Sequence, residues 1–447
     1  MTSSRRIVSS VALCLLIGVG ASLQADFLHP PPVDLEALHL PKHVDELDKA
    51  IQIFQKGDYE QCLKLLQAAG NKHSDLFPAR LILAKLFLQH NQVNQGRAAL
   101  EQVAADSPGH PEIYLVFGRL ALQEGRPTDS RLHFDKAMEL ARSGKWSEQL
   151  RQVFQGDAYD GLAAVAEHRR DWLAAVAALS ARLKLTPNNS AARQRLGVAL
   201  FHQGKRDEAA EQLLRASRDD SKLEPASLLL ARLYTEIGKR DHAAKWIAYG
   251  IEQNPKDPRL YLGQARLHLE QNQMTQAQRA VEAAAKLDAN SRDVQWLRGL
   301  IAWILKDYTA AERNLQALYQ ETPGDFAISN QLALALVEQA NETKRQKALQ
   351  LAEINARLYP NSGEPLSTLG LVYYRLGRTD QAEKALRASL SGGSGSSDTV
   401  YYLARLLAER GQSEEAKRLL KLALDAVGLF AFRNEAREQL TRLDEKP

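Results

Sequence analysis

Small and bulky apolar residues recur along this chain with a period of 34 residues. A Gly or Ala marks the period eleven times, with longer steps after its third and ninth occurrence. These residues are Ala50, Ala84, Gly118, Ala163, Gly197, Ala231, Ala265, Gly299, Ala333, Gly370 and Ala404. A second small residue follows each of them, from Cys62 to Ala416, and in most units a bulky residue such as Leu66 or Phe134 comes four places later. Because small residues let helix backbones approach closely, the pattern predicts a stack of antiparallel helical hairpins.

Proline and glycine fall at fixed places in the same period. If the first small residue is the eighth of its unit, the units begin at His43, Phe77, Pro111, Gly156, Ser190, Glu224, Pro258, Arg292, Phe326, Gly363 and Ser397. Proline, which cannot continue a helix, ends five units at Pro108, Pro187, Pro255, Pro323 and Pro360. Glycine stands between the two helices at Gly57, Gly125, Gly204, Gly238, Gly377 and Gly411.

This combination resembles the tetratricopeptide repeat family. The resemblance covers most of the chain and implies an all-α, right-handed α-solenoid of about eleven helix-turn-helix units. Behind the last unit, Phe432, Ala436 and Leu440 form one apolar helical face, which predicts a C-terminal capping helix because a solenoid must cover its open end.

The predicted organisation follows from these boundaries. Residues 1–25 form a signal peptide and 26–42 a proline-rich linker. Units 1–3 occupy 43–144, an insertion or extended turn occupies 145–155, units 4–10 occupy 156–396, unit 11 occupies 397–430, and the capping helix and tail occupy 431–447. The Gly- and Ser-rich segment Ser391–Ser397 predicts a hinge between units 10 and 11.

The N-terminus has the layout of a secretory signal. Arg5 and Arg6 precede an apolar run over residues 7–19, and small residues suit cleavage after Ala21 or Ala25. The run is shorter than the roughly 20 residues that span a bilayer, which disfavours an uncleaved anchor. We therefore expect an exported protein, periplasmic or extracellular.

Composition and motifs exclude several classes of function. A net charge of +4 over 447 residues indicates no general affinity for nucleic acid. Zinc-hydrolase, phosphate-loop and nucleophile-elbow motifs are absent from the sequence, so we expect no enzyme, cofactor or metal site. His168 and His202 share the thirteenth place of adjacent units, where a solvated edge is favoured over a metal site. Cys62 would be the one cysteine left after cleavage, and we expect a buried thiol there.

The resemblance implies that the groove lined by the first helix of each unit binds a partner, chiefly through its second, fifth, ninth and twelfth places. An apolar and aromatic set occupies these places in units 8–11, namely Trp296, Leu300, Trp303, Leu334, Val337, Leu371, Tyr374 and Tyr401. Two interpretations stay open. The set forms an exposed binding stripe, or some members pack between neighbouring helices.

A second candidate surface is basic. Lys85, Arg119, Arg232, Arg266 and Arg405 share the ninth place of their units, where guanidinium groups could bind carboxylates of an acidic peptide or anionic polymer. Glu112 and Asp157 interrupt this row.

Together these features predict a non-catalytic exported scaffold that binds a protein or peptide through its groove, in a bacterial envelope or secretion assembly, with peripheral membrane association through partners. The alternative is a carbohydrate-binding protein, with an anionic polysaccharide as ligand and Trp296, Trp303 and Tyr374 stacked on sugar rings.

Overall fold

The computed structural model describes residues 45–445 apart from 74–75, 361, 392–395 and 427–428. Throughout this described part the chain forms helices joined by short turns, and no β-strand occurs there. The predicted fold class, an α-solenoid of helical hairpins, is confirmed. The predicted signal peptide (1–25), the linker (26–42) and the centre of the proposed hinge at Ser391–Ser397 lie outside the described residues.

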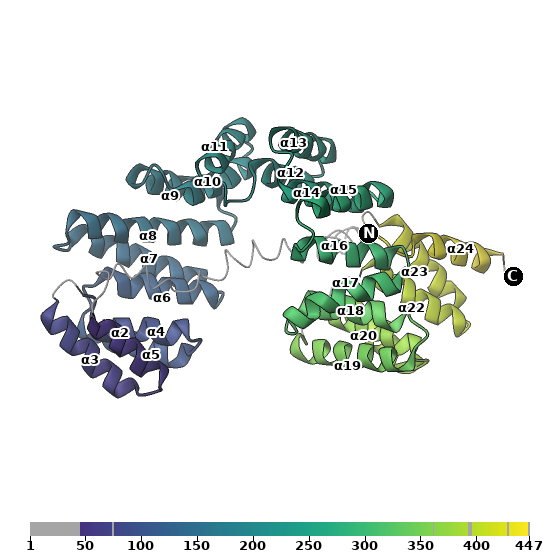
Figure 1. The fold of residues 1–447 in the computed structure, drawn as a ribbon, viewed down its shortest axis with the longest axis horizontal. Coiled ribbons are helices and arrows are strands. Elements are labelled where there is room, and N and C mark those ends of the chain that lie inside the picture. The colour runs from purple at the N-terminus through teal and green to yellow at the C-terminus, as the bar shows by residue number, and fades with distance from the viewer. Residues whose placement is uncertain (1–44, 74–75, 361, 392–395, 427–428, 446–447) are drawn as a thin grey trace. The chain divides into compact units, whose positions relative to one another are not determined.

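The chain divides into two compact units, with the division at Ala226. The first contains five helical hairpins (Figure 1). In chain order they are α2 (Asp45–Gln55) with α3 (Tyr59–Lys72), α4 (Ala79–Gln89) with α5 (Val93–Asp106), α6 (Pro111–Gln123) with α7 (Pro127–Ser143), α8 (Glu148–His168) with α9 (Trp172–Leu185), and α10 (Ser190–His202) with α11 (Arg206–Asp219).

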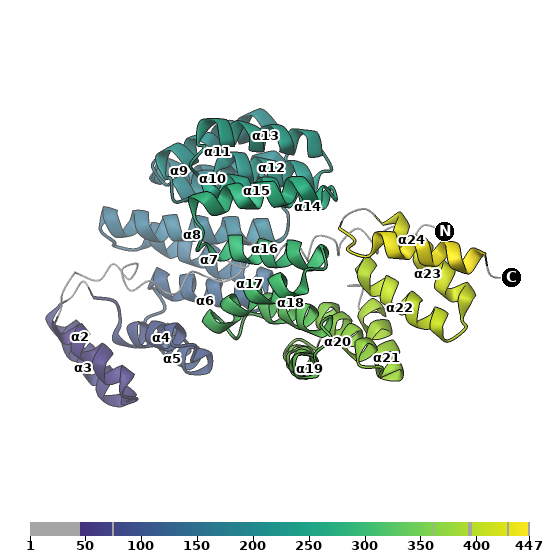
Figure 2. The ribbon, with the colours of Figure 1, turned by 45° about the vertical axis from the view of Figure 1, so that its right-hand side comes forward.

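The second unit begins at the start of α12 and contains six hairpins and a final helix. The hairpins are α12 (Ala226–Glu236) with α13 (Arg240–Gln253), α14 (Pro258–Glu270) with α15 (Met274–Leu287), α16 (Arg292–Ile304) with α17 (Tyr308–Glu321), α18 (Phe326–Val337) with α19 (Glu342–Leu358), α20 (Gly363–Arg375) with α21 (Thr379–Ser391), and α22 (Ser397–Glu409) with α23 (Ser413–Asp425). The final helix, α24 (Arg433–Asp444), packs against α23 (Figure 2). We call the first helix of each hairpin its A helix and the second its B helix.

The recurring small and bulky residues meet inside each hairpin. A Cβ atom added to Gly118 on α6 would lie 2.7 Å from the Phe134 ring on α7, and one added to Gly299 on α16 would lie 2.8 Å from Leu315 on α17. Phe134 and Leu315 are fully buried. The small residue of the A helix therefore makes room for the bulky residue of the B helix, which explains why the two recur together.

The turn inside most hairpins passes through the left-handed backbone region. All six glycines predicted between the helices have φ between 71° and 85°. Four other turns place Asn91, Arg170, Asn272 or Lys306 at φ between 57° and 64°. In three of these ten turns, an aspartate directly follows the left-handed residue. Its side chain accepts a hydrogen bond from a backbone N–H at the start of the B helix, as Asp171 does from the Ala174 N–H at 3.1 Å. Sequence thus fixes both the end of one helix and the start of the next.

Three of the described helices are longer than the rest, namely α7 with 17 residues, α8 and α19. Helix α8 has 21 residues, because residues 148–155 of the inserted segment form its first two turns. The link before it is anchored by Trp146, whose Nε1 donates to the Leu140 carbonyl at 3.0 Å. Helix α19 has 17 residues and takes up the three extra residues of its hairpin.

Candidate functional site

The predicted apolar stripe lies on the A helices of the second unit, and it is mostly buried. The buried members expose at most 9% of their surface, and they are Leu300, Trp303, Leu334, Val337, Leu371, Tyr374 and Tyr401. Trp296 is partly buried. For the buried members the exposed-stripe interpretation is wrong, because neighbouring helices and the chain's own C-terminal segment cover them. Trp303 and Tyr374 also present no exposed ring on which a sugar could stack.

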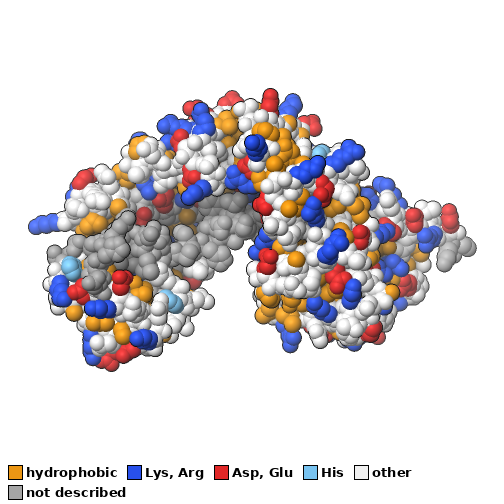
Figure 3. All heavy atoms as spheres, viewed as in Figure 1, with side chains coloured by type: hydrophobic (Ala, Val, Ile, Leu, Met, Phe, Trp, Pro, Cys, Tyr) orange, Lys and Arg blue, Asp and Glu red, His pale blue; other side chains and the backbone are white. Residues whose placement is uncertain are grey.

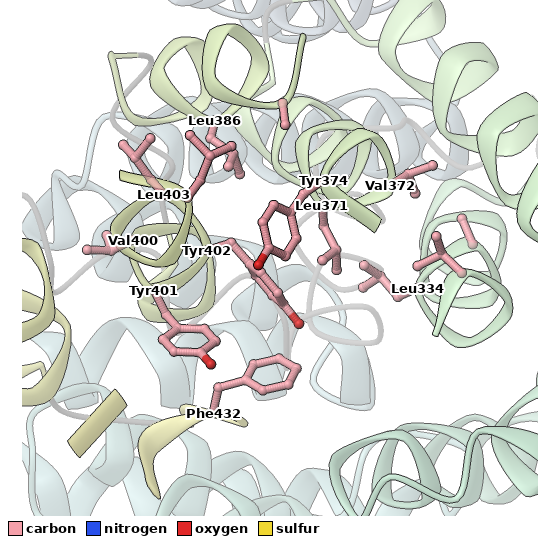
Figure 4. Close-up of a cluster of buried hydrophobic side chains, with 14 of the residues drawn as sticks. Leu334, Leu371, Val372, Tyr374, Leu386, Val400, Tyr401, Tyr402, Leu403 and Phe432 are labelled. Atoms are coloured by element: carbon pink, nitrogen blue, oxygen red, sulfur yellow. The ribbon is translucent and has the colours of Figure 1, made fainter. Parts of the chain in front are cut away.

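The aromatic rings at this place pack on one another (Figure 4). Tyr401 of α22 stacks on Phe432, with ring centroids 5.4 Å apart and an interplanar angle of 9°. Tyr402 and Trp303 meet the same Phe432 ring edge to face at 5.0 Å and 5.8 Å. Tyr374 of α20 lies 6.0 Å from Tyr402. We call Trp303, Tyr374, Tyr401 and Tyr402 the aromatic cup.

Charged groups border the aromatic cup and fix its hydroxyls. Tyr374 donates to Glu409 Oε1 at 2.5 Å, and Tyr402 donates to Glu338 Oε1 at 3.3 Å. Arg375 binds the other oxygen of Glu338 at 2.8 Å. Burial raises the pKa of Tyr402 well above its ordinary value, and it likewise raises the pKa of Tyr374. Both phenols are therefore protonated donors at neutral pH.

Two carboxyl groups on the same A helices have raised pKa values. Burial raises the pKa of Glu364 on α20 to about 7, and Asn330 donates to this carboxyl at 3.4 Å. Burial also raises the pKa of Asp398 on α22 to about 7, although the Ala431 N–H donates to it at 3.1 Å. Ionisation of either group in the folded chain is unfavourable up to neutral pH.

In the first unit the predicted basic residues are paired. Lys85 Nζ lies 2.5 Å from Glu112 Oε1, and both side chains are buried. Arg119 binds Asp157 at 2.8 Å with both side chains about one-third exposed, at 36% and 31%. Glu112 and Asp157, which interrupt the basic row in the sequence, are thus its partners on the next A helix.

The pairing continues along the A helices α8 and α10 and includes Arg182 of the B helix α9. Asp160 lies 2.7 Å from Arg182 and 3.6 Å from Arg195, and Arg195 binds Glu167 at 2.8 Å. These pairs, together with those of Lys85 and Arg119, make a set of four basic and four acidic side chains. We call this set the charged network, and its members are Lys85, Glu112, Arg119, Asp157, Asp160, Glu167, Arg182 and Arg195.

The remaining basic candidates lie in the second unit. Arg266 reaches Asp293 of the next A helix at 3.4 Å. Arg405 binds Glu409 at 3.4 Å and lies over the Tyr374 ring at 5.6 Å. Arg232 is partly buried on α12 and has interactions of its own. The five basic candidates therefore do not form a row of uncompensated positive charge.

Sequence reasoning missed these pairs although a signal was present. Lys85, Arg119 and Arg266 stand at the ninth place of their units, and each partner stands at the second place of the following unit. A basic ninth place followed by an acidic second place therefore predicts an ion pair between adjacent A helices.

A cavity of about 580 Å³ lies elsewhere in the first unit, where the inserted segment meets the first two hairpins. Its wall includes Phe77, His110, Trp146 and Phe154, whose rings contact one another. Burial, with Lys85 nearby, lowers the pKa of His110 to about 4, so its imidazole is neutral. Its Nδ1 accepts a hydrogen bond from the Glu112 N–H at 3.3 Å, so this histidine caps the N-terminus of α6.

The other sequence candidates are also accounted for. His202 stacks on Trp172 at 4.1 Å, and His168 lies in the last turn of α8. Among the described residues no cluster of His, Cys, Asp and Glu could hold a metal ion. Cys62 is buried, and burial raises its pKa to about 11, which makes the thiol a poor nucleophile. Within the described part, every helix is too short or too polar to span a membrane.

Comparisons with known proteins identify the family of this repeat architecture. A family model described as tetratricopeptide repeat matches residues 82–145, 161–225, 262–326 and 367–428, together more than half of the chain. No curated protein sequence matches.

Several solved structures are similar to this chain. A thermophilic repeat protein of Thermus thermophilus is 20% identical, with 42% of this chain and 98% of that chain covered and a TM-score of 0.36. Yeast Tom70 is 13% identical, with 90% and 94% covered and a TM-score of 0.36. The Cut9–Hcn1 hetero-tetramer of the APC/C is 15% identical, with 99% and 98% covered and a TM-score of 0.42. These low TM-scores carry no argument about function, so the assignment rests on the family model and the repeating hairpins. The chain belongs to the tetratricopeptide repeat family.

Proposed function

We propose that this protein is a non-catalytic, exported scaffold that binds another protein through the A helices of its first unit. Tetratricopeptide repeats support a protein–protein interaction scaffold in general. The observation that carries the specific proposal is the charged network, which crosses α4, α6, α8 and α10 and leaves Arg119, Asp157 and Asp160 about one-third exposed. In the second unit, the buried aromatic cup occupies the corresponding places.

The charge of the network indicates the kind of partner. Four basic and four acidic side chains compensate one another, so a polyanion would meet a carboxylate beside every cation. A protein segment that carries both charges can pair with each in turn, and such complementarity gives specificity. This favours a protein partner over an anionic polysaccharide. Surface charges of both signs are interspersed over the helices of each unit, in keeping with this chemistry (Figure 3).

The test neutralises part of the network. The double variant Asp157→Asn with Asp160→Asn removes two carboxylates from α8. A matched control, Asp135→Asn with Glu139→Gln, removes two exposed carboxylates from the B helix α7. Affinity capture with quantitative mass spectrometry should recover a protein partner with wild type and control and lose it with the α8 variant. Equal recovery by all three proteins would exclude the network as the binding surface.

Export is tested separately, because its support is the N-terminal sequence alone. We expect a bacterial host to secrete the chain with Ser22 or Asp26 as its first residue, after cleavage at one of the two predicted positions. Mass spectrometry of the N-terminal peptide measures this. An intact chain that stays in the cytoplasm would show that the exported role is wrong.

A further inference from the structure

The segment Phe430–Glu435, which ends in the first turn of α24, contacts two A helices of the second unit, α22 and α16. Its Phe432 is 6% exposed and touches three members of the aromatic cup. The Ala431 N–H donates to Asp398 of α22 at 3.1 Å. Glu435 forms an ion pair with Lys306, in the turn that follows α16.

These contacts go beyond what an end cap requires. A helix that only covers the open end of the last hairpin would touch α22 and α23. Trp303 and Lys306 belong to the hairpin of α16 and α17, three hairpins earlier in the chain. Phe430–Glu435 therefore contacts both α22 and the C-terminal end of α16, with the Phe432 ring packed on members of the aromatic cup from both helices.

The position of this contact is also the position where a partner was expected from the sequence. The second, fifth, ninth and twelfth places of A helices line the face that repeats of this kind present to ligands, and here the chain itself fills that face. The contact has the composition of a peptide complex, with a buried aromatic anchor, a main-chain hydrogen bond to the Asp398 carboxyl group and an ion pair at the rim.

We propose that the aromatic cup is a peptide-binding site and that Phe430–Glu435 is its intrachain competitor. This rests on the scaffold function proposed above and adds a second, regulated surface to it. The ligand is a protein segment with two aromatic residues at alternate positions and an acidic residue three places after the second, as in Phe430, Phe432 and Glu435. It binds only when the chain's own segment has left, because one Phe ring fills the cup.

A tethered competitor lowers the apparent affinity for an external peptide by mass action. Short flexible tethers give effective concentrations in the millimolar range, so an external peptide competes poorly until the tethered segment is weakened. Removing the Phe432 ring from the chain should therefore open the cup to the same segment supplied from outside.

The experiment uses a fluorescent peptide of residues 429–445 and the full chain. Phe432→Ala should bind the peptide saturably. The affinity of wild type and of the matched control Leu422→Ala for the peptide should be lower by a factor of about ten or more. Leu422 is an apolar residue that is 42% exposed on the neighbouring helix α23. A peptide that lacks the Phe432 ring should not bind. Equal binding by wild type and Phe432→Ala, or none by a folded Phe432→Ala chain, would overturn the proposal.

A second set of variants covers the case in which Phe432→Ala loses its fold. Lys306→Glu places two acidic side chains next to each other. Because they repel, amide hydrogen exchange of residues 430–436 should become faster, while the exchange rate of α20 stays unchanged. Adding Glu435→Lys should restore the slow exchange. Faster exchange of α20 and α22 together with the segment would show that it is an inseparable part of the repeat core, and the proposal would fail. These readouts need no cellular partner, so their failure leaves the first-unit proposal standing.

Discussion

The left-handed turn residues show how single positions limit stability. Six of these turns use glycine, but Arg170 holds φ at 57°, a conformation that costs an ordinary residue about 1 kcal/mol or more. Arg170→Gly should therefore raise the unfolding free energy of the first unit by about 0.5–1 kcal/mol. Urea denaturation followed by circular dichroism measures the change. A loss of stability would mean that the Arg170 side chain has a contact worth more than the relieved strain.

The buried pair of Lys85 and Glu112 gives the largest expected effect of one substitution. Burial lowers the pKa of Lys85, and Glu112 opposes that shift. Lys85→Met would leave the Glu112 carboxylate buried without its cation, at a cost of about 3–5 kcal/mol. Adding Glu112→Leu should recover most of this loss, because the buried charge is gone. If the single variant unfolds at the same urea concentration as wild type, the pair is solvated and the interpretation is wrong.

The hairpin of α6 and α7 shows how one bulky residue constrains two neighbours. The Phe134 ring lies where a Cβ on Gly118 would come within 2.7 Å and one on Gly161 of α8 within 2.4 Å. Gly161→Ala should cost about 1–3 kcal/mol through overpacking. Phe134→Leu should make the same alanine tolerable, because the smaller side chain frees the space. Additive losses in the double variant, measured by thermal unfolding, would contradict this coupling.

The A helices α20 and α22 predict a pH dependence for the second unit. The pKa values of Glu364 and Asp398 rise to about 7 from ordinary values of 4.5 and 3.8. Both groups bind their protons more tightly in the folded chain, so unfolding free energy falls as pH rises from about 4 to about 7. Glu282 and Glu312 have lowered pKa values, and they lose stabilisation only below this window.

The second unit should accordingly melt at a higher temperature at about pH 5.5 than at about pH 8. Glu364→Gln should flatten this dependence, because an amide keeps the oxygen that Asn330 contacts and carries no charge. Differential scanning calorimetry at the two pH values measures the midpoints. A wild-type midpoint that rises with pH would contradict the sign.

The fold of the chain was predictable because its determinants are local and repeated. Gly118 and Phe134, for example, stand 16 residues apart and meet within one hairpin, so the period itself encodes the contact. The burial of Trp303 and Tyr401 was not predictable in this way. It depends on Phe432, which follows the last repeat, three repeats beyond that of Trp303, and a repeat pattern does not encode contacts between distant repeats. The acidic partners of Lys85 and Arg119 were predictable only by comparing two units, because each ion pair joins the ninth place of one unit to the second place of the next.

The molecule as described combines two kinds of A-helix surface. In the first unit, the charged residues from Lys85 to Arg195 are paired, and Arg119, Asp157 and Asp160 among them stay about one-third exposed. In the second, the aromatic cup is filled by Phe432. We therefore predict that an external protein partner contacts the first unit, and that it binds the aromatic cup of the second unit only after the chain's own segment is displaced.

Photo-crosslinking in the exporting cell measures which helices the partner contacts. A photoreactive side chain is placed at Ala164, a partly buried residue one turn after Asp160 on the A helix α8, and in a separate chain at the exposed Asp135 on the B helix α7. The network carboxylates of α8 are kept, and we predict that the position of Ala164 yields a specific protein adduct and that the position of Asp135 does not. Adducts of equal yield from both positions, or an adduct from Asp135 alone, would show that the A helices of the first unit do not bind the partner.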